Sequence, residues 1–296
     1  MFTLFIPVLD MHDLTRRCLE YVAATVADKA HFRVVIVDNC SEPVYTLSKY
    51  NDLGLNICGI RNEVNRGMFY PLSQVYNLFP DSQIIAGIHN DVFIYEPDWD
   101  LRVRKAFAQD SKLALLGFCG SSEVDNLGGR GGDTKCYFDG RAGQKQENTG
   151  RRISGLEPAA ILDSLSMMFR ANVIPSLELR TSDPLYHFWD KVLPMKLIDQ
   201  GLHVAVLGIQ IDHIGGQTAV GKGDRFEPHA LQWCKEQKVD FGPSINGGHG
   251  MYLEAEKRMF EFGAPRGLIP CKVQPDYTLA RTYGQATYPW QFREKI

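Results

Sequence analysis

The sequence predicts an α/β protein built on a largely parallel β-sheet with helices on both faces. Apolar, β-branched runs of strand length recur through roughly the first 120 residues, and segments of helical periodicity separate most of them. The order reads β-α-β-β-α-β-α-β, which is typical of a sheet covered by helices. The strand candidates are apolar on both faces, as strands buried in a parallel sheet are.

The elements of this sheet follow from the pattern in chain order. Either Asp10 or Asp13 can cap the first helix, because a carboxylate there accepts from free N–H groups. That helix is expected to continue through residue 30 on an apolar face at helical spacing. The remaining predicted elements are strands at 3–8, 33–37, 55–60 and 112–118, a strand that opens the stretch 84–94, and helices at 70–78 and 99–108.

Further along the chain the pattern continues with less regularity. Residues 159–173 are strand-like or mixed, and Asp183-Pro184 begins a helix that ends at Gly201, a favoured residue just past a helix. A strand follows at 203–207. Residues 251–262 are expected to be helical. The tail from 263 to 296 is rich in Pro, Tyr and Arg, and its role is not readable from the pattern.

Composition indicates an ordinary globular protein. The chain has 296 residues, is 44% hydrophobic and 23% charged, and carries a net charge of −3. Its seven cysteines form no C-x-x-C pair, which favours reduced thiols over a disulfide framework or a cysteine metal site. No secretory signal and no membrane-spanning run is found. We therefore expect a soluble, cytoplasmic protein.

The segment 119–157 differs from its surroundings. It contains the run Gly128-Gly129-Arg130-Gly131-Gly132, and six basic residues oppose three acidic ones between 128 and 152. No Gly-Lys-Ser/Thr follows, so it is a poor match to a P-loop. The segment is expected to be a long loop, either mobile beside an active site or a solvated insertion.

The stretch 84–94 is the centre of the functional prediction. A buried strand runs directly into His89-Asn90-Asp91 and then returns to an apolar run. Ligands of open α/β sheets bind beyond the carboxyl ends of such strands. These three side chains are either part of a ligand site or a polar turn that caps a core strand.

Several motifs occur in the order typical of one enzyme family. They are Ile6-Pro7-Val8, Val35-Ile36-Val37-Asp38-Asn39, Asn62-x-x-Asn65-Arg66-Gly67, His89-Asn90-Asp91, Phe188-Trp189-Asp190 and Asp212-His213-Ile214-Gly215-Gly216. With these motifs, residues 1–218 resemble the GT-A glycosyltransferases, specifically the inverting, family-2-like branch that uses nucleotide sugars. The resemblance implies a GT-A domain at 1–220. Residues 221–296 would be an extension packed on or near the active site.

The resemblance implies a set of donor-binding residues. Asp38 would accept hydrogen bonds from the base or ribose, and Gly67 allows close backbone approach beside the charged Arg66. The structural alternatives are a turn aspartate for Asp38 and a plain loop for 65–67. The full set of expected nucleotide-sugar-binding residues is Pro7, Asp38, Asn65, Arg66, Gly67, Asn90 and Asp91.

A divalent cation is implied at Asp91 and His213. Asp91 matches the last acid of the family's Asp-x-Asp motif, and His213 resembles its late metal-ligand histidine. The sequence departs from the pattern at His89, which stands in the first acidic position. Imidazole suits Mn²⁺ better than Mg²⁺, so Mn²⁺ is favoured and Mg²⁺ is the second choice, with or without His89 as a ligand.

Asp190 is the predicted general base, the carboxylate that takes the proton of the acceptor hydroxyl. Trp189 replaces the first acid of the family's pair, and it either stacks on an acceptor ring or packs in the core. His187 and Asp183 are alternative bases. Asp163 and Arg170 either reach the substrates or form a buried ion pair.

The predicted function is a metal-dependent, inverting glycosyltransferase that takes its sugar from a nucleoside-diphosphate sugar, with UDP favoured. The acceptor is a saccharide or a hydroxymethylated base of DNA, for which a local basic patch suffices. Two other functions stay open. One is a binding module of the same fold without turnover, motivated by His89 and Trp189. The other is a nucleotidyltransferase, although the residues after the first strand lack its basic, glycine-rich loop.

Overall fold

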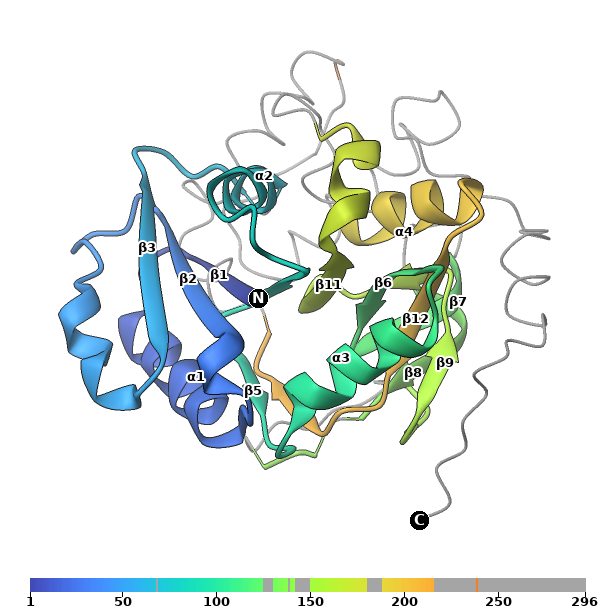
Figure 1. Ribbon diagram of the computed structural model, residues 1–296, viewed down its shortest axis with the longest axis horizontal. Helices are drawn as coiled ribbons and strands as arrows, with labels where there is room; N and C mark the ends of the chain where they lie inside the picture. Colours follow the sequence, from blue (N-terminus) through green and yellow to red (C-terminus); the bar gives the residue numbers. More distant parts are fainter. Residues whose placement is uncertain are drawn as a thin grey trace.

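The computed structural model describes residues 1–67, 69–124, 130–137, 139–141, 150–179, 188–215 and 238. Its centre is an eight-stranded sheet in the order β3-β2-β1-β4-β11-β6-β12-β9 (Figure 1). The strands that share one direction are β1 (Phe2–Val8), β2 (Phe32–Asn39), β3 (Asn56–Asn62), β4 (Ile84–Ile88), β6 (Leu113–Gly117) and β12 (His203–Leu207). Only β11 (Ser166–Arg170) and β9 (Leu156–Pro158) oppose them. The mostly parallel sheet is therefore confirmed.

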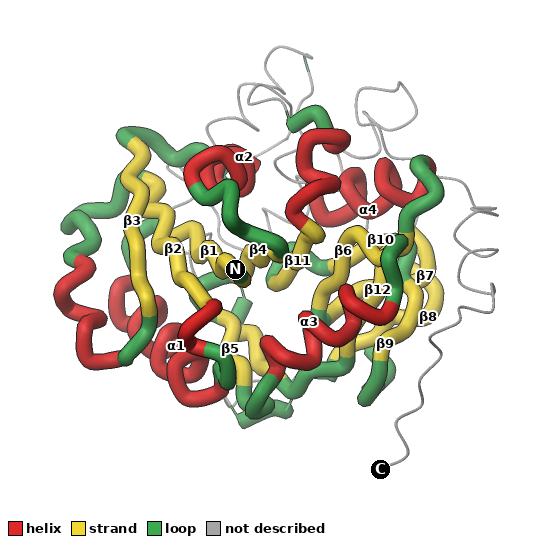
Figure 2. The backbone as a smooth tube through the Cα atoms, viewed as in Figure 1, coloured by secondary structure: helices red, strands yellow, loops and turns green. Residues whose placement is uncertain are grey.

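Helices cover both faces of this sheet (Figures 1 and 2). One face packs against α1 (His12–Thr25) and α3 (Trp99–Gln109), and the other packs against α2 (Phe69–Leu78) and α4 (Trp189–Asp199). Side chains alternate between the two faces of a strand, so Leu4 and Ile6 join the first core whereas Phe5 joins the second. Both cores are buried, which explains why the strands are apolar throughout.

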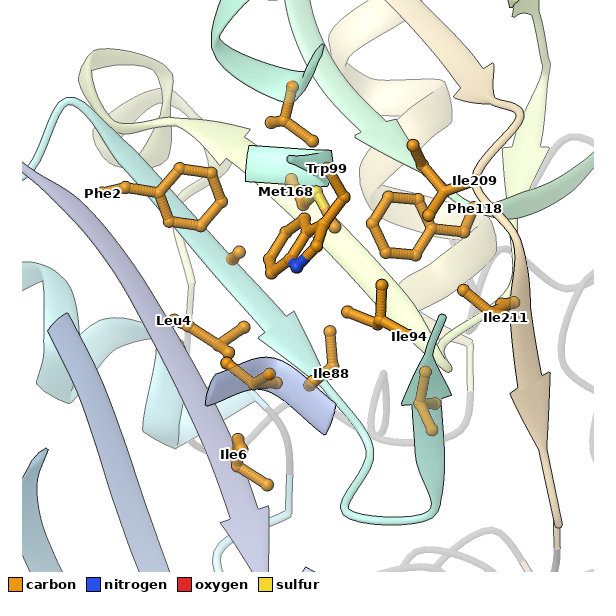
Figure 3. Packing of buried hydrophobic residues seen from close by; sticks show 14 of the residues in the cluster. Phe2, Leu4, Ile6, Ile88, Ile94, Trp99, Phe118, Met168, Ile209 and Ile211 are labelled. Atoms are coloured by element: carbon orange, nitrogen blue, oxygen red, sulfur yellow. The ribbon is translucent and has the colours of Figure 1, made fainter. Parts of the chain in front are cut away.

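Trp99 is the largest side chain of the first core (Figure 3). Its ring meets Phe2 edge-on at 5.7 Å between centroids and Phe118 edge-on at 5.9 Å. Such aromatic pairs contribute about 0.5–1.5 kcal/mol beyond the area that they bury. The first residue of α3 is thereby fixed on β1 and on Phe118, the residue after β6.

The start of α1 differs from the prediction. Neither Asp10 nor Asp13 caps the helix: the residue before it, Met11, adopts a left-handed conformation and makes no side-chain cap. The Asp10 carboxylate instead accepts a 2.7 Å hydrogen bond from the backbone N–H of Glu42. It therefore joins two loops that lie side by side at the ends of β1 and β2, a long-range contact that local spacing does not reveal.

The segment 119–157 also differs from the expected loop. Cys119–Val124 forms β7, which pairs antiparallel with β8 (Arg130–Cys136) and β10 (Ile161–Leu162). Glycine and charged residues have low strand propensity, but this pairing buries Cys119 and Cys136 opposite each other. The rest of the expected loop at 125–129, 138 and 142–149 lies outside the described residues.

Most of the expected C-terminal elements also lie outside the described residues. These are the start of the helix at Asp183, the alternative base His187, the residue Gly216 and the extension 221–296 apart from Lys238. Helix α4 begins at Trp189 after the N-cap residue Phe188, and Gly201 follows the helix with the left-handed φ of 76° expected of such a residue. Among the described residues, no helix has the length and apolar character needed to cross a membrane.

Because β1, β2, β4, β6 and β12 are parallel, they all end on the same side of the molecule. We call this side the carboxyl end of the sheet, and the opposite side the amino end. Beyond the carboxyl end, β5 (Val92–Ile94) and β13 (Ile211–His213) form a short antiparallel pair. Segments about 120 residues apart in the sequence therefore meet beside the turn that follows β4.

Candidate active site

The turn His89-Asn90-Asp91 lies between β4 and β5, at the carboxyl end of the sheet. The backbone N–H of His89 donates to the carbonyl of Leu165 at 3.0 Å, and the Asn90 amide donates to Thr15 Oγ1 at 3.0 Å. These bonds hold the turn on β11 and on α1. The side-chain amide of Asn90, a predicted donor-binding residue, is thus directed to α1.

His89, Asp91 and His213 form a cluster. Their ligand atoms all lie within 4.8 Å of one another. His213 Nε2 is 3.3 Å from Asp91 Oδ1, and His89 Nδ1 is 3.9 Å from the same oxygen. The pairing of β13 with β5 creates this contact, because His213 lies opposite Val92 and the N–H of Ile214 donates to the Asp91 carbonyl at 3.1 Å.

Burial and charge set the pKa values in the cluster. Burial alone would raise the pKa of Asp91, but the nearby His213 and His89 outweigh it and hold that pKa at about 2. Burial would lower the pKa of His213, whereas the Asp91 carboxylate raises it to about 8. For His89, burial prevails and the pKa is lowered. Without a metal, an ionised Asp91 therefore neutralises a protonated His213 at pH 7.

The donor set fits a divalent cation. The buried Nε2 of His213 makes no hydrogen bond within the described residues, although Asp91 Oδ1 is near enough for an ion pair. A buried nitrogen without a hydrogen bond is costly unless it is charged or bound to a metal. Two imidazoles and one carboxylate form a mixed N,O site that suits Mn²⁺ better than Mg²⁺.

Asp38 is the last residue but one of β2 and is buried. Its carboxylate accepts hydrogen bonds from the N–H of Ser41 at 2.7 Å and from Arg61 Nη1 at 2.5 Å. These contacts order the loop that follows β2. Pro7 lies near the end of the neighbouring strand, opposite Val37. The structure places both residues at the carboxyl end of the sheet, and it also gives Asp38 the structural role that the sequence left as an alternative.

The loop 65–67 is held by a network of amides. Asn39 donates to the carbonyl of Gly67 at 3.0 Å, and Asn62 donates to Asn39 Oδ1 at 2.9 Å. The buried Asn65 accepts from the N–H of Gly67 at 3.0 Å, and Gly67 has a left-handed φ of 67°. The loop therefore has a defined shape at the end of β3. Arg66 is the exposed residue of the three, and its guanidinium lies 5.3 Å from the Tyr70 ring centroid.

Asp190 lies in the first turn of α4 and is buried. Both of its carboxylate oxygens are 3.0 Å from Lys191 Nζ. Since α4 ends shortly before β12 begins at the amino end of the sheet, the helix starts towards the carboxyl end (Figure 1). Trp189 packs in the core, which was one of its two predicted roles, the other being to stack on an acceptor ring.

Two sets of contacts near the cluster were not predicted, although Asp212 and Asp163 themselves were singled out in the sequence. The buried Asp212 accepts from Tyr95 Oη at 3.0 Å and from the N–H groups of Asp139 and Gly140 at 3.1 and 2.7 Å. It thereby ties the basic segment to the strand that carries His213. Asp163 pairs with Arg130 at 3.2 Å. Asp163 was foreseen only with Arg170, which instead donates to three backbone carbonyls at the amino end of the sheet.

Comparison with known proteins identifies the fold. No family model and no curated protein matches the sequence. A similar solved structure is the mannosyltransferase PcManGT from Pyrobaculum calidifontis in complex with GDP-Man and Mn²⁺. It is 12% identical over 95% of this chain and 73% of that chain, with a TM-score of 0.52.

A second similar structure is GalNAc-T7 with UDP, GalNAc and Mn²⁺. It is 11% identical over 95% of this chain, with a TM-score of 0.58. The match spans 53%, about half, of the GalNAc-T7 chain. Identities this low show a shared fold rather than a shared activity. The chain thus has the GT-A fold of nucleotide-sugar glycosyltransferases, as the sequence predicted.

Proposed function

We propose that this protein is a metal-dependent glycosyltransferase that moves a sugar from a nucleoside-diphosphate sugar to an acceptor hydroxyl with inversion. The observation that carries the proposal is the cluster of His89, Asp91 and His213 at the carboxyl end of a GT-A sheet. This is the side of an open α/β sheet on which ligands bind. Neither fold nor cluster would suffice alone, because GT-A-like sheets serve several functions and histidine–aspartate pairs are common.

The cluster would hold the cation through one carboxylate oxygen of Asp91 and one nitrogen each of His89 and His213. When bound, the cation would neutralise the diphosphate of the donor and of the leaving nucleotide. The turn is fixed by the bond from Asn90 to Thr15, so Asp91 stays in position without a metal. Mn²⁺ is favoured over Mg²⁺ because two of the three ligands are imidazoles.

The nucleotide would lie across the ends of β1, β2 and β3. Asp38 would accept from the base or the ribose with the lone pair that Ser41, Arg61 and the backbone N–H of Tyr45 leave free. Pro7 and the amide-held loop 65–67 would form the wall of this subsite, with Arg66 as its exposed cation. UDP is the favoured nucleotide. The nucleotides in the two similar structures, GDP-Man and UDP, support this class of donor.

Asp190 would be the general base. An inverting transfer needs a carboxylate that accepts the proton of the acceptor hydroxyl while its oxygen attacks the anomeric carbon. The Lys191 ammonium forms an ion pair with Asp190 at 3.0 Å. When the acceptor binds, its hydroxyl would either displace this ammonium from the carboxylate or bind the carboxylate alongside it. The acceptor is a saccharide, or a hydroxymethylated base of DNA that the basic residues at 128–152 would contact through phosphates.

The decisive experiment measures release of free nucleoside diphosphate. The purified full chain is incubated with UDP-, GDP- and dTDP-sugars and Mn²⁺, with and without hydroxymethylated DNA. Asp91→Ala should lower the rate by about 10³-fold or more, because the diphosphate charge would lose its metal. Asp81→Ala is the matched control, since Asp81 pairs with Arg33 at the amino end of the sheet and should leave the rate unchanged.

The same experiment tests the second candidate function, a nucleotide-sugar or carbohydrate-binding module of the same fold. The engagement of Asp190 by Lys191 and the core position of Trp189 are the observations in its favour. This function predicts Mn²⁺-dependent nucleotide binding in calorimetry without release of nucleoside diphosphate from any donor. If neither binding nor release occurred with any nucleotide, the proposed function would be wrong.

A further inference from the structure

Arg130 and Asp163 form a pair that lies beside the metal cluster. Asp163 precedes β11, whose residue Ser166 lies opposite Ile88 at the end of β4. One residue nearer to Asp163, the carbonyl of Leu165 accepts the N–H of His89 at 3.0 Å. Because the two strands are antiparallel, the chain before Ser166 runs beside the chain after Ile88. Asp163 therefore lies next to the His89–Asp91 turn, at the carboxyl end of the sheet.

Four contacts fix the orientation of this pair. The N–H of Leu165 donates to Asp163 Oδ1 at 3.1 Å, and Asp163 Oδ2 is 3.2 Å from Arg130 Nη1. The backbone N–H of Asp163 donates to the carbonyl of Cys119 at 2.8 Å, and Arg130 Nη1 also reaches Cys119 Sγ at 2.7 Å. The pair thus joins β8, β7 and the start of β11, which belong to different parts of the sequence.

Both side chains keep hydrogen-bonding capacity. Within the described residues, Nε and Nη2 of Arg130 make no hydrogen bond, and a third of its side chain is exposed, 32%. Asp163 is 23% exposed and uses only one lone pair of each oxygen in the contacts above. A fixed carboxylate beside a fixed guanidinium offers acceptors and donors within one small area, which is what adjacent hydroxyl groups of a sugar require.

We propose that Arg130 and Asp163 bind hydroxyl groups of the sugar that is transferred, and that they thereby determine donor specificity. This inference rests on the proposed function, because it places the sugar next to a diphosphate held at His89, Asp91 and His213. The pair carries no net charge. It therefore adds little attraction for the diphosphate itself, whereas a carboxylate with a hydroxyl forms a strong, directional hydrogen bond.

The test compares binding of a nucleotide with and without its sugar. Calorimetry with Mn²⁺ is performed on UDP and on UDP-glucose, UDP-galactose and UDP-N-acetylglucosamine, or on the GDP or dTDP series if the wild type prefers it. Asp163→Asn keeps the acceptor for the Leu165 N–H but removes the charge, and Arg130→Lys keeps the charge but removes the fork of donors. The matched controls are Asp81→Asn and Arg33→Lys, which alter an ion pair at the amino end of the sheet.

We expect the two variants to change the affinity for the nucleotide sugar but not the affinity for the nucleotide alone. Both variants should bind UDP as the wild type does but should bind the preferred UDP-sugar about 10- to 100-fold more weakly, the effect of losing one hydrogen bond to a charged group. Their preference between the C4 epimers should shrink as well. The controls should change neither affinity. If one of the two variants failed to fold, it would lose UDP binding as well, and the inference would then be tested with the other variant alone.

Two results would overturn the inference. If the affinities for UDP and for the UDP-sugar fell together, the pair would contact the diphosphate or only support the fold. If both affinities stayed unchanged while the acceptor KM rose, the pair would belong to the acceptor subsite. A wild-type protein that bound no nucleotide at all would instead contradict the proposed function, and with it the premise of this inference.

Discussion

The two ends of the central sheet differ in how their charged and polar groups are paired. At the amino end, Arg33 binds both carboxylate oxygens of Asp81 at 2.9 and 3.0 Å, and His203 Nδ1 is 2.5 Å from Asp110 Oδ2. Arg170 donates to three backbone carbonyls there. At this end each of these ionic groups has a partner within the chain, and the arrangement is complete without a ligand.

The carboxyl end is not complete in this sense. Three ligand atoms converge within 4.8 Å, and Nε2 of His213 is buried without a hydrogen bond among the described residues. The difference teaches where to look for function. Polar groups at the amino end stabilise the fold, whereas the proposed function assigns the cluster at the carboxyl end to a bound cation. Matched substitutions at the two ends of the sheet test whether their polar groups differ in this way.

The largest expected effect is a difference in kcat between substitutions at the two ends of helix α4. Asp190 begins α4 near the carboxyl end, and Asp199 ends it near the amino end. Asp190→Asn should lower kcat by about 10²–10⁴-fold, the usual contribution of a general base, with donor affinity unchanged. Asp199→Asn should leave kcat unchanged. Steady-state kinetics with the donor found in the release assay measure both. Equal rates for the two variants would remove Asp190 from the mechanism.

A smaller effect is expected from a pair of histidines. His213→Ala should weaken Mn²⁺ binding by about 100-fold or more because a ligand is lost. It should also destabilise the metal-free fold, because the buried Asp91 loses its ion-pair partner. His203→Ala should leave Mn²⁺ binding unchanged but lower the free energy of unfolding by about 1–3 kcal/mol, because the buried Asp110 loses its imidazole partner. Calorimetric titration and denaturant unfolding distinguish the two. Should both histidines prove to affect only stability, the comparison between the ends would fail.

The sequence predicted those parts of the fold that local pattern controls. β1, β2, β4 and α3 follow from apolar runs and helical spacing, and the structure confirms them within a residue or two. The antiparallel insertion of β11 between β4 and β6 was not predicted, because strand direction depends on where a distant segment returns to the sheet. β7 and β8 were also missed, since their glycine and charged residues form strands only through tertiary pairing.

For the candidate site, the motif order placed Asp91 and His213 together, although they are far apart in the sequence. It did not reveal that Asn90 anchors the turn to Thr15 or that Asp163 pairs with Arg130. Those contacts depend on which side chains a loop and a neighbouring helix present to each other. No local signal encodes them, because the same residue types occur in turns, caps and surface pairs throughout the chain.

The smallest expected effect is a pH dependence of stability and of Mn²⁺ affinity that arises from His213 at the carboxyl end of the sheet. Without metal, the pKa of His213 is raised to about 8 by Asp91, against burial that would lower it. The ion pair therefore stabilises the metal-free fold fully below about pH 6.5, and this contribution is lost as the pH rises through about 8. Metal binding requires the neutral imidazole, so Mn²⁺ affinity should change in the opposite sense, rising up to about tenfold per pH unit until about pH 8 and then levelling.

This dependence can be measured by calorimetric titration with Mn²⁺ at several pH values, in buffers of different ionisation enthalpy. On the order of one proton should be released per metal at pH 7. His203→Ala should retain this release, because His203 pairs with Asp110 at the amino end and takes no part in metal binding. Binding that is independent of pH between 6 and 8 would mean that the cation does not displace the His213 proton, and Asp91 would then hold it without this imidazole.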